Sequence, residues 1–228
     1  MVNSKASKIK SPDFIGIGAP RTGTTWLYEH LSRHPNIWMP PVKEIHFFDR
    51  VDGFSMMERK FRLDLKNRAA SYIFPNKKKN RTPNICWDLN YFFRRPDFNW
   101  YSSLFLPERD QVTGEITPAY SLLDQKIVEK IFTYYPSMRI IFLMRDPIER
   151  AWSHAIKRLA RDRKEDAKQI SDEKFLESII GRRNPYEQII FEHYRYGRVC
   201  FQRVKFILIS TMKSRLLQKK YCYAFSSF

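Results

Sequence analysis

Residues Gly18 to Thr25 are of a type and spacing that can bind phosphate. The run Gly-Ala-Pro-Arg-Thr-Gly-Thr-Thr matches the phosphate-loop pattern G-x-x-x-x-G-K-[ST], except that Thr24 stands at the lysine position. A glycine-containing turn at a helix N-terminus points several backbone N–H groups at one spot, and the helix dipole adds positive potential there. Thr24 and Thr25 add hydroxyl donors, and Arg21 can supply the missing cation. The alternative interpretation is an ordinary tight turn after a strand.

The missing lysine restricts which donors this loop can bind. ATPases, GTPases and small-molecule kinases need that lysine and magnesium to hold and neutralise the β- and γ-phosphates. A donor with a single 5′-phosphate that bears a sulfuryl group carries less charge at this point. Such a donor can be bound without a metal ion, so we expect no metal at the site.

A second candidate phosphate site follows another apolar run. Arg145 and Ser153 belong to the segment Arg-Asp-Pro-Ile-Glu-Arg-Ala-Trp-Ser, which begins where residues 139–144 end. The planar guanidinium of arginine can bind two phosphate oxygens, and serine adds a neutral donor. Asp146 and Pro147 also have the positions of a helix N-cap and first helical residue, so a well-capped structural helix is the alternative.

A candidate base lies between these two segments, in the run Lys-Glu-Ile-His-Phe-Phe-Asp at residues 43–49. Transfer of a group to a hydroxyl or amine needs a base for the acceptor proton, and the two phenylalanines would raise the pKa of Glu44 toward a value suited to that role. His46 is a competing base or a structural histidine. Lys43 could stabilise negative charge on the transferred group, or could simply form a surface ion pair with Glu44.

These three segments together resemble the motifs of the sulfotransferases that use 3′-phosphoadenosine 5′-phosphosulfate (PAPS), and in motif they are closest to the glycan and heparan-sulfate type. The loop at residues 18–25 resembles the 5′-phosphosulfate loop P-[KR]-[ST]-G-T-T. The segment at residues 145–153 resembles the 3′-phosphate motif R-D-P-x-x-R-x-x-S. Residues 43–49 resemble the family segment K-E-x-x-F-F-D. The resemblance implies PAPS as the donor substrate and no metal.

The resemblance also implies a role for individual positions. Arg21 would contact the bridging or sulfuryl oxygens, and Glu44 would take the acceptor proton. The implied donor-binding residues are Pro20, Arg21, Thr22, Gly23, Thr24, Thr25, Trp26, Arg145 and Ser153. The catalytic candidates are Glu44, Arg21 and His46. Gly114 to Tyr120 resembles another family segment, E-K-T-P-x-Y, but Ile116 replaces its lysine, so any contact of that lysine is absent.

Strands and helices are predicted to alternate around these motifs. Strands are expected over residues 13–18, 111–116 and 139–144, with helices from Thr24 and over 123–135. This order favours an α/β fold of the P-loop type, with three layers in which a short central parallel sheet is flanked by helices. The donor would bind at the carboxyl ends of the strands.

The chain is expected to contain one enzymatic domain. We assign residues 1–12 to a basic tail, 13–196 to the sulfotransferase domain and 197–228 to a divergent basic segment, with a helix over 172–180 and a last strand over 206–209. No Asp or Glu follows Glu192. This ending is typical of a truncation or a shifted reading frame. The alternative function is therefore a non-catalytic, truncated relic that binds anionic glycan or nucleic acid.

Composition restricts the partners and the location. A net charge of +17 favours anionic partners, although a generally basic solvated surface is the plainer interpretation. The apolar runs are too short to span a membrane, and three cysteines without CxxC spacing indicate a reducing, cytoplasmic location. The expected acceptor is a glycan or a small alcohol, bound by the aromatic-rich region 51–110; lipid and peptide acceptors stay open, and nucleic acid is not expected.

Overall fold

A computed structural model describes residues 11–49, 57–73, 83–108, 110–163 and 206–210. The strands are β1 (Phe14–Gly18), β2 (Ile37–Trp38), β3 (Val112–Ile116), β4 (Arg139–Met144) and β5 (Phe206–Ser210). The helices are α1 (Thr24–Leu31), α2 (Met57–Ile73), α3 (Ile85–Phe93), α4 (Phe98–Ser103), α5 (Gln125–Tyr134) and α6 (Pro147–Arg163), with a 3₁₀ helix, η2, at Pro118–Leu122.

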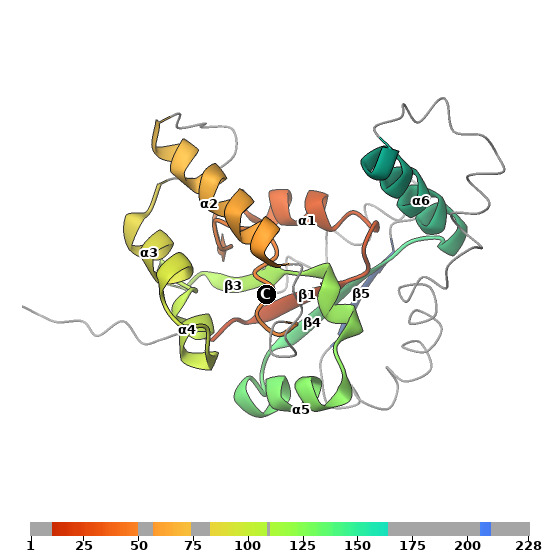
Figure 1. Cartoon of the computed structure of the whole chain (residues 1–228). Coiled ribbons are helices and arrows are strands. Elements are labelled where there is room, and N and C mark those ends of the chain that lie inside the picture. The colour runs from red at the N-terminus through yellow and green to blue at the C-terminus, as the bar shows by residue number, and fades with distance from the viewer. Residues whose placement is uncertain (1–10, 50–56, 74–82, 109, 164–205, 211–228) are drawn as a thin grey trace, which may run out of the picture.

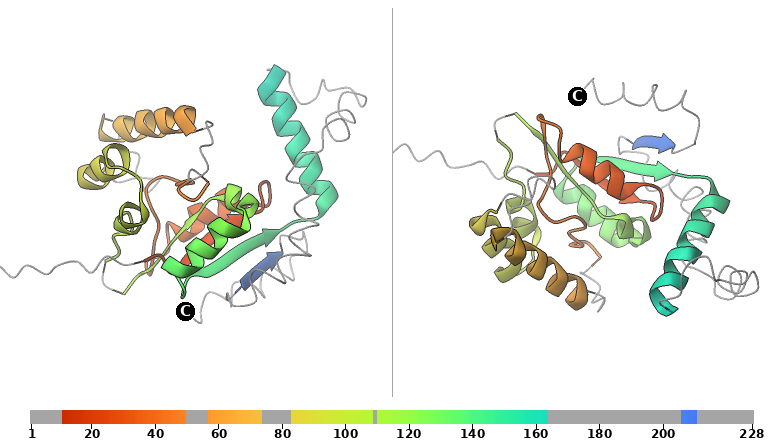
Figure 2. Two further views of the ribbon diagram at one scale, coloured as in Figure 1. Left: turned by 60° about the horizontal axis from the view of Figure 1, so that its bottom comes forward. Right: turned by 90° about the horizontal axis from the view of Figure 1, so that it is seen from above.

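All five strands form one parallel sheet in the order β2-β3-β1-β4-β5, with helices on both faces (Figures 1 and 2). Successive side chains of a strand point to opposite faces, so β1 supplies both halves of the core. Phe14 belongs to the same buried cluster as Leu27 of α1, whereas Ile15 belongs to the cluster that contains Ile127 of α5 and the aromatic residues of α3 and α4. The predicted three-layer α/β fold is confirmed.

The strands of the sheet centre approach each other closely. All five residues of β1 are buried, as expected for a strand that is covered on both faces. A Cβ atom at Gly114 of β3 would lie 2.5 Å from the ring of Phe14, so only glycine leaves room for that ring. The register that pairs Phe14 with Gly114 is thereby fixed by packing as well as by hydrogen bonds.

Short polar side chains begin the helices. Asn84, Asp97 and Asp124 accept hydrogen bonds from the backbone N–H groups three residues ahead, at 3.0, 2.6 and 2.9 Å. Asp146 does the same for Glu149 at the start of α6, at 2.9 Å. The predicted helix start after β4 is therefore confirmed, and Asp146 is explained by this cap.

The region 51–110, in which the sequence predicts no elements, contains α2, α3 and α4. Indole N–H groups connect α3 and α4, since Trp87 donates to the Leu104 carbonyl and Trp100 donates to the Asn90 carbonyl, each at 2.8 Å. Arg68 of α2 pairs with Asp88 of α3 through two buried hydrogen bonds of 2.6 and 2.8 Å. Aromatic packing and this ion pair hold the three helices as one unit beside the sheet.

Most predicted elements agree with the structure to within a few residues. The last strand is confirmed as β5, which pairs in parallel with β4. The expected helix over 172–180, residues 1–10 of the basic tail assigned to 1–12, and most of the segment 197–228 lie outside the described residues.

Candidate active site

Four neighbouring strands direct the candidate site segments to one edge of the sheet. The phosphate loop follows β1, the segment 43–49 follows β2, Tyr120 follows β3 and Arg145 follows β4. Because these strands are parallel and adjacent, their carboxyl ends meet at the same edge. Segments that are far apart in the sequence therefore form one candidate site.

The loop after β1 has the backbone geometry of an anion site. Gly23 occupies the N-cap position of α1 with φ 95°, a conformation that favours glycine. The buried Thr22 donates its hydroxyl hydrogen to the Ala19 carbonyl at 2.6 Å, so this side chain closes the loop internally. Thr24 is buried and Thr25 is exposed at the helix N-terminus, where free N–H groups and the helix dipole favour a negative ligand.

The two predicted phosphate-binding segments meet through their side chains. The Arg21 guanidinium donates to Ser153 Oγ at 3.0 Å from Nε and 2.7 Å from Nη2. Arg145 Nη1 donates to the Arg21 carbonyl at 3.3 Å. Arg21 is more than 120 positions from Arg145 and Ser153 in the sequence, yet the fold brings the three residues together.

Arg145 also forms an ion pair with Glu149, in the first turn of α6. Its Nε and Nη2 atoms each lie 3.2 Å from Glu149 Oε2. The ion pair is partly exposed, so a phosphate can compete for the guanidinium without leaving a buried charge unpaired.

Pro20 lies within the phosphate loop sequence, and Trp26 follows that sequence directly. The Trp26 side chain is 61% exposed, and its ring stacks on His30 with the ring centroids 4.0 Å apart. An exposed indole beside a phosphate site offers a flat apolar surface. Donor binding by Pro20 and Trp26, which the resemblance implies, stays a prediction.

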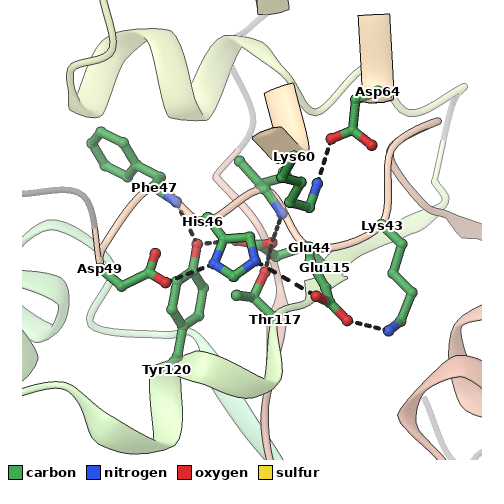
Figure 3. Close-up of polar contacts among 11 residues, drawn as sticks. Lys43, Glu44, His46, Phe47, Asp49, Lys60, Asp64, Glu115, Thr117 and Tyr120 are labelled. Carbon is green, nitrogen blue, oxygen red and sulfur yellow. Dashed lines mark hydrogen bonds and ion pairs between the residues drawn. The ribbon is translucent and has the colours of Figure 1, made fainter. Parts of the chain in front are cut away.

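Lys43, Glu44, His46 and Asp49 form a connected charge network in the loop that follows β2 (Figure 3). Glu44 forms an ion pair with Lys43, and Glu44 Oε2 lies 3.5 Å from His46 Nε2. On the other side of the ring, His46 Nδ1 lies 2.6 Å from Asp49 Oδ2. The imidazole therefore lies between two carboxylates.

This network overturns the expected direction of the Glu44 pKa shift. Burial raises the pKa of Glu44, but the His46 hydrogen bond and the Lys43 charge outweigh burial and lower the pKa to about 2. Phe47 and Phe48 have their rings in the aromatic core, where they pack with Tyr101. Prediction of a raised pKa from the two phenylalanines was therefore wrong, because the charged neighbours outweigh the loss of solvent.

His46 shows the complementary shift. Burial lowers the pKa of His46, whereas hydrogen bonds to Asp49 and Glu44 raise it, and the result is about 9. The imidazole is therefore protonated at neutral pH. A protonated imidazole cannot act as the base, so the geometry favours His46 as the group that orients Glu44.

Glu115 of β3 anchors this loop from below. Its carboxyl is fully buried, and it accepts hydrogen bonds from Tyr101 Oη at 2.6 Å, Thr117 Oγ1 at 2.7 Å and Tyr120 Oη at 3.1 Å. The backbone N–H of Ile45 donates to it as well, at 3.2 Å. Burial raises the pKa of Glu115, and the four donors partly offset that rise.

Three residues at the site have left-handed backbone conformations. Among the described residues, the non-glycine residues with positive φ are Arg21 (71°), Glu44 (64°) and His46 (56°). Such conformations are uncommon, and they persist where surrounding contacts hold them. These are the same three residues that the sequence selects as catalytic candidates.

Sequence reasoning missed the roles of Glu115, Tyr120 and Asp49. Phe47 N–H donates to Tyr120 Oη at 2.7 Å, so Glu115 and Tyr120 hold the loop at two successive points. One signal was available, since Glu115 is a charged residue in an otherwise uncharged, buried strand. Ile116 is buried against α1, so the family lysine that it replaces would lie in an apolar environment here.

No group of three or more potential metal ligands occurs among the residues that the structure describes. Donor binding without a metal stays a prediction.

We predict that Glu115→Gln destabilises the protein by about 2 kcal/mol. Each carboxylate oxygen accepts two hydrogen bonds, and the amide NH₂ group that replaces one oxygen would face two donors without accepting from either. Urea unfolding followed by circular dichroism measures the change in the free energy of unfolding. Glu129→Gln on the exposed side of α5 is the control, with an expected change below about 0.5 kcal/mol. A similar small change for Glu115→Gln would contradict the anchoring role.

We predict that His46 titrates with a pKa of about 9, well above its ordinary value of 6.5. Its contribution to stability is thus present below pH 6.5 and is lost as the pH rises through about 9. NMR titration of the imidazole signals, assigned with His46→Gln, measures the midpoint. Asp49→Asn should move it down, and a wild-type midpoint at or below neutral pH would refute the network.

Comparison with known proteins agrees with these motifs. Residues 12–182 match the sulfotransferase family. The chain is 29% identical over 142 residues to the membrane-associated sulfotransferase kil1 of Dictyostelium discoideum, covering 62% of this chain and 22% of that protein. It therefore spans about a fifth of the length of that curated relative.

Similarity to a solved structure supports the fold. The sulfotransferase from Alicyclobacillus acidocaldarius aligns with a TM-score of 0.54 and 20% identity, over 96% of this chain and 92% of that one. Motifs, fold and the match over most of the sequence agree: the chain belongs to the sulfotransferase family.

Proposed function

We propose that this protein transfers the sulfuryl group of PAPS to an acceptor hydroxyl or amine, with carbohydrate as the acceptor class. The observation that carries the proposal is the meeting of Arg21, Arg145 and Ser153 at the N-terminus of α1. Two guanidinium groups, one hydroxyl and a helix N-terminus suit a donor with phosphates at two positions.

Donor binding would use charges that are already in position. Arg21 reaches from the 5′-phosphosulfate loop to the 3′-phosphate segment, so one bound nucleotide can contact both. Arg145 would exchange the Glu149 carboxylate for phosphate oxygens. Because Arg145 is oriented by the Arg21 carbonyl, little side-chain freedom remains to be lost on binding.

Transfer would proceed by a direct in-line displacement. The acceptor oxygen or nitrogen forms a bond to sulfur while the bond between sulfur and the 5′-phosphate oxygen breaks, and 3′,5′-bisphosphoadenosine (PAP) leaves with that electron pair. The acceptor proton passes to Glu44. Lys43 would stabilise negative charge on the sulfuryl or bridging oxygens, as an electrostatic contribution to the transition state.

The Lys43–Glu44 ion pair supplies a means of activating the base. In this structure Lys43 contributes to the low pKa of Glu44. If the ammonium turns to the donor, that contribution is lost and the pKa of Glu44 rises, which makes the carboxylate a better proton acceptor. His46, already protonated, would keep Glu44 oriented through Nε2.

Carbohydrate is the acceptor class that the loop after β2 supports best. The segment 43–49 resembles that of the glycan-type enzymes, and Lys60 of α2, which forms an ion pair with Asp64, lies close enough to His46 to lower its pKa. Basic residues near the base suit an acidic or already sulfated sugar. A cytoplasmic location stays a prediction, and none of the described helices is long and apolar enough to cross a membrane.

We predict that PAP binds with micromolar affinity in magnesium-free buffer, and that Arg145→Ala weakens binding about tenfold or more. Isothermal titration calorimetry measures both values. Lys130→Ala removes one positive charge from the exposed side of α5 and should leave the affinity within about twofold. No PAP binding by a folded sample would contradict the donor site, and would favour the relic that binds anionic polymers.

We predict that Glu44→Gln lowers the transfer rate by about 10²-fold or more, as loss of a general base does, with PAP affinity nearly unchanged. Transfer from sulfur-radiolabelled PAPS to uronate-containing and neutral oligosaccharides, and to simple alcohols, measures the rate and the acceptor class. His46→Gln should retain more activity. An active Glu44→Gln variant would exclude Glu44 as the base.

A further inference from the structure

Helix α3 is apolar on both of its sides. Its inner side carries Trp87 and Tyr91, which are buried in the core. Its outer side carries Ile85, Leu89 and Phe93, whose side chains are 63%, 53% and 74% exposed. A helix of a soluble domain normally presents polar residues to solvent, so this outer face is unusual.

The three exposed residues form one stripe. They are spaced by four residues, so they lie above one another on a single face of the helix. Cys86 on the same side is exposed as well and adds no charge. The described surface thus presents a short, continuous apolar face, of the kind that marks an interaction site.

The exposed charges nearest to this face in the sequence are positive, and the next charged residue, Asp97, caps α4. Arg94 and Arg95 follow Phe93 directly, and both are exposed. The one acidic residue of α3 is Asp88, and it is buried, with its carboxylate bonded by Arg68 and by the Tyr72 hydroxyl. No carboxylate of α3 therefore opposes an anionic surface.

We propose that the outer face of α3 docks on an anionic lipid surface, with Ile85, Leu89 and Phe93 entering the boundary between headgroups and acyl chains. Arg94 and Arg95 pair with the anionic headgroups. Apolar insertion combined with adjacent basic residues is the pattern of interfacial helices. A lipid surface also matches the small size of the patch, because a few side chains are enough for reversible attachment.

A second copy of the chain fits this face less well. Three side chains expose a few hundred Å², whereas a stable protein interface buries about 800 Å² on each partner. Pairing through α3 would also place two Arg94–Arg95 pairs in one small interface. Lipid is therefore the occupant that charge and area favour.

The position of α3 is compatible with catalysis at a membrane. In Figures 1 and 2, α3 and α6, the helix that carries Ser153, lie at opposite ends of the sheet. Attachment through α3 leaves the phosphate loop and α6 open to solvent. The proposal does not depend on the transfer reaction, so PAP binding serves as a control for folding.

Vesicle sedimentation tests the proposal, with phosphatidylcholine vesicles prepared with and without phosphatidylserine. We expect the wild-type chain to bind the anionic vesicles, and Phe93→Glu to weaken binding about tenfold or more. Lys130→Ala on α5 lowers the net charge by the same amount as Phe93→Glu, and it should bind within about threefold of wild type. Every variant should bind PAP as the wild type does.

The Phe93→Trp variant distinguishes insertion of the α3 face into the bilayer from electrostatic adsorption of a basic protein on its surface. Its added fluorescence should be quenched by brominated lipid, beyond the quenching of the wild-type tryptophans. Equal vesicle binding by wild type and Phe93→Glu, or no added quenching in Phe93→Trp, overturns the proposal. A lipid-free dimer that Phe93→Glu dissociates, seen by light scattering, would overturn it in favour of a second copy.

Discussion

The buried carboxyl of Glu115 is the constraint on which the rest of the site depends. A carboxylate without solvent is costly unless its oxygens accept hydrogen bonds, and here two tyrosines, a threonine and the Ile45 N–H supply them. The last of these donors belongs to the loop that carries Glu44 and His46, both in left-handed conformations. The same interaction that satisfies Glu115 therefore holds an unfavourable backbone in place, and connects the candidate base to the centre of the sheet.

Preorganisation of charge is the second feature of the site. Each cation that the proposed reaction needs is already held by a protein group: Lys43 by Glu44, Arg145 by Glu149, and Arg21 by Ser153. Local pairing keeps these side chains ordered in the absence of a ligand, and the partly exposed pairs can be exchanged for an anion at low cost. The Lys43–Glu44 pair has a further consequence, because the same contact that orients the base also lowers its pKa.

The sequence was informative where local pattern and local chemistry agree. Buried apolar runs predicted β1 and β4, the alternation of strands and helices predicted β3, and Asp146 predicted the start of α6. It was uninformative for α3, whose apolar residues lie on both sides and so give no clear helical period. It was misleading for Glu44, because two adjacent phenylalanines suggested an apolar environment. Their rings turn into the core, while a lysine and a histidine reach the carboxylate.

The amino-acid sequence by itself determined the chemical groups and their local frames: a glycine-containing loop before a helix, an Arg-Asp-Pro helix start, and a Glu-x-His segment. These local conformations depend on neighbouring residues, so short-range steric and capping rules are sufficient to predict them. Only the tertiary structure decided that Arg21 meets Ser153, that Glu115 anchors the Glu44 loop, and which way the pKa of each group moves. Electrostatic interactions and hydrogen bonds act through space, so their outcome depends on which distant segments the parallel sheet brings to one edge.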